Sequence, residues 1–313
     1  MWAEIAAVVF NINTVDAAIR LAVPIALAAM GGTFSERAGI INIGLEGMLL
    51  SGAFAAVLGS YLTGNPWVGV AAGVFAGALS AAVFGVFTIE LKANHVVAGV
   101  GINILALGIT TWLMQVIWGS RGTSPSVEGI GRVMIPGISG LPVVGRLLGM
   151  QSPFVYMMFA LVALGWFVLF KTPVGLRIRM TGEHPEAADT VGINVRLIKH
   201  ASVIFGGALC GLGGAYLSLG HLSWFSMDMS AGRGYMALAA NIFGRWNPLG
   251  GLGASFLFSY SDALQMRMQG LPIALPHNLI QMIPYLLTIV VLAGAVIRAR
   301  PPAALGNHYT PGK

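Results

Sequence analysis

Long apolar runs, separated by short polar stretches, make up most of the chain. Runs that are long or apolar enough to be membrane spans occur at about nine places. They cover residues 15–32, 40–62, 66–89, 96–118, 153–170, 201–220, 231–243, 249–266 and 279–297. The pattern predicts an all-α, polytopic integral membrane protein with about eight or nine transmembrane helices, some of them broken or short.

The run at 231–243 leaves the number of crossings open. It is short for a full crossing, so it predicts either a tucked or re-entrant helix or a pass shortened by protein on all sides. A second pattern favours nine passes: N-P-x-x-G occurs at Asn65 to Gly69 and again at Asn247 to Gly251. On nine passes the two copies face opposite sides, as an inverted repeat requires. The alternative is that N-P-x-x-G simply starts two unrelated helices, because Pro suits the first helical turn.

Composition agrees with a membrane protein. The 313 residues are 56% hydrophobic and only 9% charged, and the mean hydropathy of +0.80 lies far outside soluble globular usage. The net charge of +6 does not indicate nucleic-acid binding, because the basic residues cluster at the ends of apolar runs rather than in one patch. The single cysteine, Cys210, excludes disulfides within the chain and cysteine-based metal sites.

The chain is predicted to form one transmembrane domain over residues 1–313. Segment 1–14 lacks a basic region typical of a cleaved signal and is predicted to be interfacial. Basic residues flank segment 171–199 and begin the tail at 298–313, so the positive-inside rule places both in the cytoplasm. Segment 119–152 has a smaller basic excess and is predicted to be an extracytoplasmic loop.

Glycine spacing predicts how the helices pack. Gly69, Gly73 and Gly77 share one helix face, as do Gly207 and Gly211, so neighbouring backbones can approach closely there. A further group on one run either leaves room along a transport path or has a packing role. This group consists of Gly99, Gly101 and Gly108.

Motifs for chemistry are missing from the sequence. No lysine lies in a G-x-x-x-x-G-K-[ST] phosphate loop, so any ATP must be hydrolysed by another subunit. The histidines are scattered without H-E-x-x-H or paired-His spacing, and G-x-S-x-G does not occur. We therefore expect no catalytic residue, no metal and no cofactor.

Two polar segments interrupt the apolar pattern. From Thr33 to Met48, glycines and polar groups predict an interrupted helix, and Glu46 within it must be paired or functional because an acid at membrane depth is costly. It either braces the break through backbone amides or contacts substrate. From Gly232 to Pro248, glycines and Asn241 predict another short helix facing a cavity.

Four motifs, in order along nearly the whole chain, carry a family resemblance. They are E-R-A-G-I-I-N-I-G-L-E-G at 36–47, G-E-H-P-E-A-A at 182–188, G-I-N-V at 192–195 and F-G-R-W-N-P at 243–248. The sequence resembles permeases of ATP-binding-cassette (ABC) importers, in the ribose and branched-chain amino acid permease superfamily, and within it the nucleoside-type subunits.

This resemblance implies a multi-pass subunit of the cell (inner) membrane with its C-terminus in the cytoplasm. Its partners would be a second permease subunit, cytoplasmic ATPase subunits, an extracytoplasmic binding protein or lipoprotein, and membrane lipid. Segment 171–199 would contain a short coupling helix that docks into the ATPase. The coupling residues would be Glu183, His184, Pro185, Glu186, Ala187, Ala188, Asp189, Gly192 and Ile193. This loop is more acidic than the family's usual version, so the ATPase groove should be basic.

The implied function is translocation of a small polar solute, most readily a nucleoside, by alternating access driven by ATP hydrolysis elsewhere. Amide and acidic side chains at membrane depth would line the path, with helix packing as their alternative role. They are Asn42, Glu46, Asn103 and Asn241. Two other readings remain open: the same machinery carrying a simple sugar such as ribose, and a secondary transporter with a proton or sodium relay through Glu46, Asp262 and His277.

Overall fold

The computed structural model describes residues 11–134 and 149–270, residues 300–310, and isolated positions at 145, 147, 279, 282, 286 and 289. The predicted span at 279–297 and most of segment 1–14 therefore lie outside the described residues. The helices in chain order are α2 (Ile12–Arg37), α3 (Leu45–Thr63), α4 (Pro66–Gly85) with the π-helical turn η1 (Val86–Glu90), α5 (His95–Trp118), α7 (Pro153–Lys171), α8 (Pro173–Glu183), α9 (Pro185–Thr190), α10 (Val195–Ala215) with the π-helical turn η2 (Tyr216–Leu222), α11 (Arg233–Phe243) and α12 (Pro248–Gln269). Two short strands, β1 (Val133–Met134) and β2 (Met150–Gln151), pair antiparallel.

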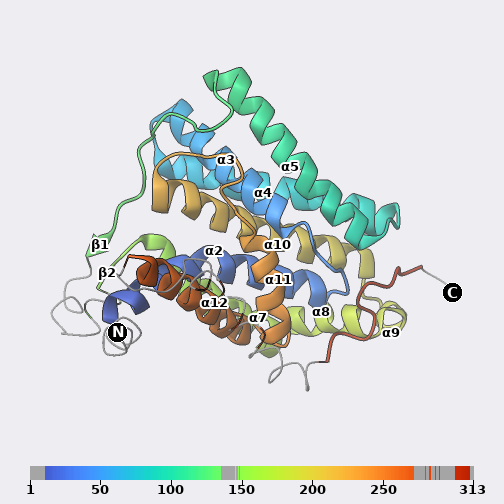
Figure 1. Cartoon of the computed structure of the whole chain (residues 1–313). Helices are drawn as coiled ribbons and strands as arrows, with labels where there is room; N and C mark the ends of the chain where they lie inside the picture. The colour runs from blue at the N-terminus through green and yellow to red at the C-terminus, as the bar shows by residue number, and fades with distance from the viewer. Residues whose placement is uncertain are drawn as a thin grey trace.

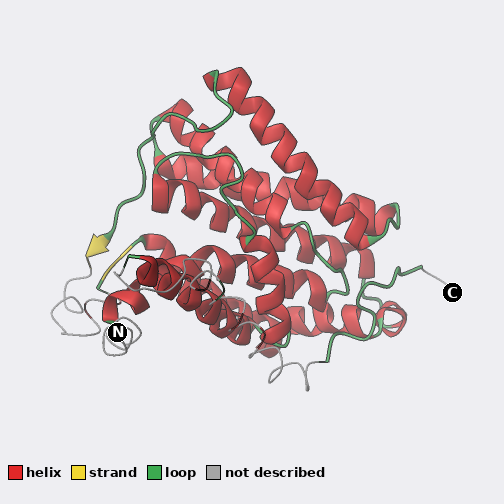
Figure 2. Cartoon of the chain, in the orientation of Figure 1, coloured by secondary structure: helices red, strands yellow, loops and turns green. Residues whose placement is uncertain are grey.

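The described chain is a helical bundle with almost no sheet, which confirms the predicted polytopic class (Figures 1 and 2). In this part of the chain, six helices are long and apolar enough to cross a membrane: α2, α3, α4 with η1, α5, α7, and α10 with η2. Helix α11 has 11 residues, which gives a length of about 16 Å against a hydrocarbon core of about 30 Å. The run at 231–243 therefore contains a short helix, which both predictions for it share.

Three helices form the centre of the bundle and three face outward. In the most apolar window of α2, 83% of residues are buried, and α3 and α10 are similar, whereas in α5 only 22% are buried. In the corresponding windows of α4 and α7, 33% of the residues are buried. Apolar side chains on the outside are what a lipid environment favours, so α4, α5 and α7 form the lipid-facing or subunit-facing layer.

Close backbone contact joins α4 to the central helices. A Cβ placed at Gly77 would lie 2.7 Å from the Cα of Gly211, and one at Gly73 would lie 2.8 Å from the carbonyl oxygen of Gly52. The prediction of close packing through these glycines is confirmed. By contrast, a Cβ at Gly101 or Gly108 on α5 meets nothing within 4 Å.

The segments between helices gather at two ends of the bundle. At one end, which we call the Arg37 end, Arg37 Nε donates to the carbonyl of Trp246 (2.8 Å) and Gly306 N–H donates to the carbonyl of Gly39 (3.1 Å). At the other, the Asn11 end, Ser60 Oγ donates to the carbonyl of Glu128 (3.2 Å). Figure 1 shows α8 and α9 near the C-terminus and the β1–β2 pair near the N-terminus, at opposite ends of α2.

The two N-P-x-x-G motifs start helices at opposite ends. Asn65 Oδ1 accepts from Trp67 N–H (2.9 Å) and caps α4, while Asn247 Oδ1 accepts from Leu249 N–H (3.0 Å) and caps α12. Asn247 follows Trp246 at the Arg37 end, whereas Asn65 lies at the Asn11 end, just after α3. This is the arrangement that an inverted repeat requires, and the repeat itself stays a prediction.

Candidate functional site

The polar residues of the first interrupted helix form a break between α2 and α3. Helix α2 ends at Arg37, and Gly39 turns the chain with a φ of +89°, which favours glycine. Asn42 is fully buried and its Oδ1 accepts from the backbone N–H of Gly44 (3.1 Å) at the start of α3. Helical structure is thus interrupted at 38–44, within the stretch from Thr33 to Met48 for which the sequence predicted an interrupted helix.

Glu46 in the first turn of α3 holds the N-terminus of α11. Its Oε1 accepts from Gly232 N–H (2.7 Å) and its Oε2 from Gly234 N–H (2.5 Å). A carboxylate at a helix N-terminus satisfies unpaired amides and interacts favourably with the helix dipole. Gly234 permits this approach, because a Cβ there would lie 2.7 Å from Oε2. Glu46 therefore braces α11, 188 positions away in sequence, rather than its own break.

Asn103 on α5 likewise caps the N-terminus of α3. Its Oδ1 accepts from Gly47 N–H (2.8 Å), and its Nδ2 donates to the carbonyl of Ile43 (3.1 Å) and to the hydroxyl of Tyr235 on α11 (3.0 Å). The N-termini of α3 and of the short helix α11 therefore meet inside the bundle and are capped by protein side chains. Tyr235 was not among the predicted site residues, because an aromatic residue near a span end has no distinguishing sequence signal.

A second cluster holds the other end of α11. Asn241 Nδ2 donates to Glu36 Oε2 (2.8 Å), and the Trp246 indole N–H donates to the same oxygen. Thr33 Oγ1 donates to Asn241 Oδ1 (2.7 Å). Glu36 and Trp246 each lie in a family motif, which was the signal that could have identified them. Helix α11 is thus attached to α3 at its beginning and to α2 at its end.

The four predicted path residues are brought together in part. Asn42, Glu46 and Asn103 lie around the start of α3, whereas Asn241 lies at the far end of α11 beside Glu36. All four are buried and each is engaged in hydrogen bonds within the protein. In this conformation Asn103 joins α5 to α3 and α11, Glu46 joins α3 to α11, and Asn241 joins α11 to α2.

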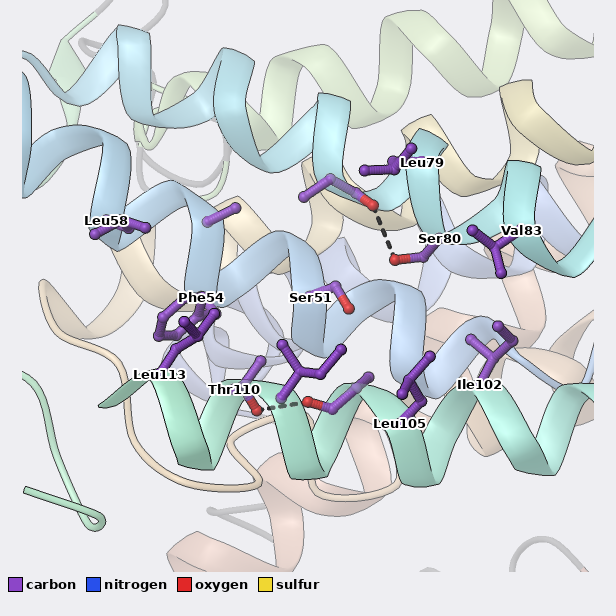
Figure 3. Close-up of a pocket in the computed structure, with 14 residues that line it drawn as sticks. Ser51, Phe54, Leu58, Leu79, Ser80, Val83, Ile102, Leu105, Thr110 and Leu113 are labelled. Carbon is purple, nitrogen blue, oxygen red and sulfur yellow. Dashed lines mark hydrogen bonds between the residues drawn. The ribbon is translucent and has the colours of Figure 1, made fainter. Parts of the chain in front are cut away.

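A groove of about 400 Å³ lies between α3, α4 and α5 (Figure 3). Its walls are apolar except for Ser51, Ser80 and Thr110. Ser80 Oγ donates to the carbonyl of Ala76 (2.9 Å) and Thr110 Oγ1 to that of Ala106 (2.7 Å), so both hydroxyls are satisfied within their own helices. The groove suits acyl chains or a neighbouring helix better than a polar solute. In the described part of the chain, no three His, Cys, Asp or Glu side chains gather as a metal site would require.

Comparison with known proteins decides the family. Residues 14–292 match the family described as branched-chain amino acid transport system / permease component. The chain belongs to this permease family.

Named permeases are similar over nearly the full chain. The guanosine ABC transporter permease protein NupQ of Bacillus subtilis is 40% identical over 96% of this chain and 97% of its own length. The nucleoside ABC transporter permease protein NupC of Lactococcus lactis is 38% identical over 93% of this chain and 94% of its own length. The putative glucose ABC transporter permease protein TsgC13 of Haloferax volcanii is 35% identical over 96% of this chain and 98% of its own length. The predicted resemblance to ABC permeases is confirmed.

The loop with the predicted coupling residues contains a six-residue helix, α9. Helix α9 covers Pro185–Thr190, with Pro185 in its first turn and Glu186 directly after it. Ala188 is buried, while His184, Glu186, Ala187 and Asp189 are exposed. Of the coupling residues that the resemblance implied, Pro185 to Asp189 lie in this helix, whereas Glu183, His184, Gly192 and Ile193 flank it.

Residues on either side of α9 fix its position. Glu183 is the last residue of α8, and its Oε2 accepts from Ala303 N–H (3.0 Å). After α9, Gly192 turns the chain with a φ of +81°, and Ile193 N–H donates to the carbonyl of Ala188 (3.0 Å). A six-residue helix anchored at both sides is thereby presented to solvent at the Arg37 end.

Removing the Glu46 carboxylate should destabilise this permease. Glu46→Ala leaves the N–H groups of Gly232 and Gly234 without acceptors, and each buried unpaired donor costs about 1–3 kcal/mol. We expect a loss of about 2–5 kcal/mol in the free energy of unfolding, with Glu46→Gln intermediate because it keeps one acceptor. The measurement is denaturant or thermal unfolding of the purified permease in detergent.

Glu90→Ala is the matched control. Glu90 forms half-exposed ion pairs with Arg196 (3.5 Å) and His200 (3.1 Å), which contribute at most about 1 kcal/mol. A Glu46→Ala protein as stable as the Glu90→Ala protein would contradict the bracing role of Glu46.

Proposed function

We propose that this chain is the membrane-embedded permease subunit of an ABC importer that carries nucleosides across the cell membrane. The observation that carries the proposal is the full-length similarity to NupQ and NupC, whose names state a guanosine and a nucleoside transporter. An uncharged polar solute agrees with the amide-rich, mostly uncharged polar groups around the start of α3. Transport by this subunit requires no covalent chemistry on the solute.

Two features support ATPase subunits as partners: the missing phosphate-binding loop and the exposed helix α9. No phosphate-binding loop occurs in the sequence, so energy must come from separate ATPase subunits. Helix α9 is the contact that fits them, because it is short, exposed and acidic. A second permease subunit is supported by the relatives, since Bacillus subtilis has both NupQ and NupP among the guanosine permease proteins. An extracytoplasmic binding protein or lipoprotein would deliver the solute at the other face.

We place the Arg37 end in the cytoplasm. The basic residues of the 171–199 segment and Arg300 lie there, and cytoplasmic loops are enriched in Lys and Arg. The Asn11 end, with the 119–134 segment, then faces outward and the described C-terminal residues lie inside.

Alternating access would centre on α11. This helix is attached at one end through Glu46 to α3 and at the other through Glu36 to α2. Movement of α9, driven by the ATPase, would shift α2 and the 38–44 break. This shift would alter the hydrogen bond between Asn241 and Glu36 and so release α11. A path past Asn42, Glu46 and Asn103 would then open. The closed arrangement described above is one end state of that cycle.

A simple sugar is the second candidate solute. TsgC13 is named as a putative glucose permease and matches at 35% identity. Relatives named for a sugar and for nucleosides are therefore both similar to this chain. An ion-coupled secondary transporter has less support. Glu46 is occupied by two backbone amides and Asp262 lies on α12, while His277 lies outside the described residues.

Competition for uptake separates nucleosides from sugars. The complete transporter is reconstituted in vesicles with ATP, and uptake of labelled guanosine is measured against excess unlabelled nucleosides, ribose or glucose. We expect nucleosides to abolish labelled uptake and sugars to leave it unchanged. Uptake of labelled ribose or glucose in the same vesicles, with no uptake of labelled guanosine, would assign the chain to the sugar carriers instead.

A further inference from the structure

Residues 300–310 lie against the coupling region and form a second wall beside α9. We call this segment the C-terminal strap. Figure 1 shows it in dark red beside α8 and α9. Sequence alone gives no reason for it to be ordered, because it contains prolines, glycine and small residues without a helical pattern.

The strap is fixed to three other parts of the Arg37 end: the 38–44 break, the turn before α5 and the end of α8. Within the strap, Pro302 and Ala304 are buried, and Gly306 turns the chain with a φ of +81°. Its hydrogen bonds run from Ala304 N–H to Gly182 O (2.9 Å), Ala303 N–H to Glu183 Oε2 (3.0 Å), Gly306 N–H to Gly39 O (3.1 Å) and Lys92 Nζ to Thr310 Oγ1 (2.9 Å). A segment held at four points is part of the folded surface.

Between the strap and α9 is a cleft of about 430 Å³. One wall comes from the end of α8 and from α9, and the other from the strap. The side chains that line it are Glu183, His184 and Glu186 on the first wall and Asn307, His308 and Tyr309 on the second. The cleft is therefore polar on both sides and opens at the end where the ATPase is proposed to bind.

The charge of this cleft is negative. Glu183 and Glu186 line the cleft, and its described lining includes no Lys or Arg. Asp189 is exposed beside it and raises the pKa of Tyr309 on the strap to about 12. Arg196, which lowers the pKa of Tyr309, lies outside the lining of this cleft and is paired with Glu90 (3.5 Å). Just beyond α9, Val191 leaves 66% of its side chain exposed. An apolar contact beside a charged rim is the usual composition of a protein interface.

We infer that α9 and the C-terminal strap together form one docking cleft, which receives a basic side chain of the ATPase subunit. The inference rests on the proposed function and adds to it the strap as a binding surface and the charge of the partner group. A six-residue helix alone offers little area, and a second wall enlarges the contact and fixes its orientation. Because the strap also bonds to Gly39, the same contact links the ATPase to the break that precedes Glu46.

Protection of single cysteines from a maleimide tests the two walls separately. The one native cysteine, Cys210, is fully buried, so added cysteines report alone. Ala187→Cys marks α9, Asn307→Cys marks the strap, and Thr123→Cys marks the Asn11 end; all three positions are exposed. Labelling rates are compared between the purified permease and the assembled permease–ATPase complex.

We expect labelling at both 187 and 307 to slow by about tenfold in the complex, because a packed interface excludes the reagent, and labelling at 123 to stay unchanged. Protection at 187 without protection at 307 would overturn the role of the strap and leave the proposed function intact. Protection at neither position would contradict both.

A substitution in the strap gives an independent readout. Gly306→Val strains a φ of +81° and places a Cβ 2.9 Å from Ile41 Cδ1. We expect the ATPase to dissociate from this variant at a lower salt concentration than from the wild type. Gly64→Val is the control, since Gly64 has a φ of +67° with nothing within 4 Å and lies at the Asn11 end. Equal salt resistance of the two variants would count against a docking role of the strap.

Discussion

Gly211→Leu should prevent this permease from folding, whereas Gly101→Leu should leave it folded. A Cβ at Gly211 would lie 3.0 Å from both the carbonyl carbon of Gly73 and the Cα of Val74, and closer still to the Gly73 carbonyl oxygen. These are backbone atoms, so no side-chain rotation makes room for four added carbons. Helices α4 and α10 would have to separate. The close backbone contact on which helix association in a membrane depends would then be lost.

Gly101→Leu is the control, because it introduces the same side chain where there is room for it. Gly101 is also in a transmembrane helix, α5, but nothing lies within 4 Å of its Cβ position. The measurement is the fraction of detergent-solubilised protein that elutes as a single species in size-exclusion chromatography, together with its unfolding midpoint. A Gly211→Leu protein that is as well folded as Gly101→Leu would show that the α4–α10 crossing is wrong.

Glu186→Lys should abolish ATP-driven uptake while the membrane fold stays intact. Glu186 is exposed on α9, and within the described part of the chain it contributes to an acidic cleft. Reversing its charge places two positive groups together at the proposed contact, and like charges across an interface cost several kcal/mol. We therefore expect affinity for the ATPase to fall by about tenfold to a hundredfold, which corresponds to about 1.4–3 kcal/mol.

Glu128→Lys is the matched control for charge reversal. Glu128 is also exposed, lies at the Asn11 end, and uses only its backbone carbonyl in the hydrogen bond from Ser60. This variant should retain uptake and ATPase binding, and both variants should have wild-type unfolding midpoints. Full uptake and normal assembly of Glu186→Lys would contradict the docking role of α9.

Much of the fold could be predicted because its determinants are local. Apolar runs located the helices to within a few residues, and Asn65 and Asn247 start helices as their N-P-x-x-G context predicted. The close approach of α4 to α10 followed from glycines spaced four residues apart on one face. Each of these signals depends on residues near one another in the sequence.

The partners of the polar residues could not be predicted in the same way. The cost of an acid at membrane depth required Glu46 to be paired, but its partners are two backbone amides 186 and 188 positions away. Any backbone N–H can donate to a carboxylate, so the sequence does not indicate which N–H groups are the partners of Glu46. The strap is a similar case, because it binds through its own backbone N–H groups to the carbonyls of Gly39 and Gly182.

The central claim is that this chain transports its solute only when coupled to an ATPase. It is tested by guanosine uptake into vesicles that contain the permease with its ATPase and ATP, compared with vesicles that contain the permease without any ATPase. The account predicts uptake that requires ATP and disappears when the ATPase is left out. Uptake that persists without the ATPase, driven by an ion gradient alone, would contradict it.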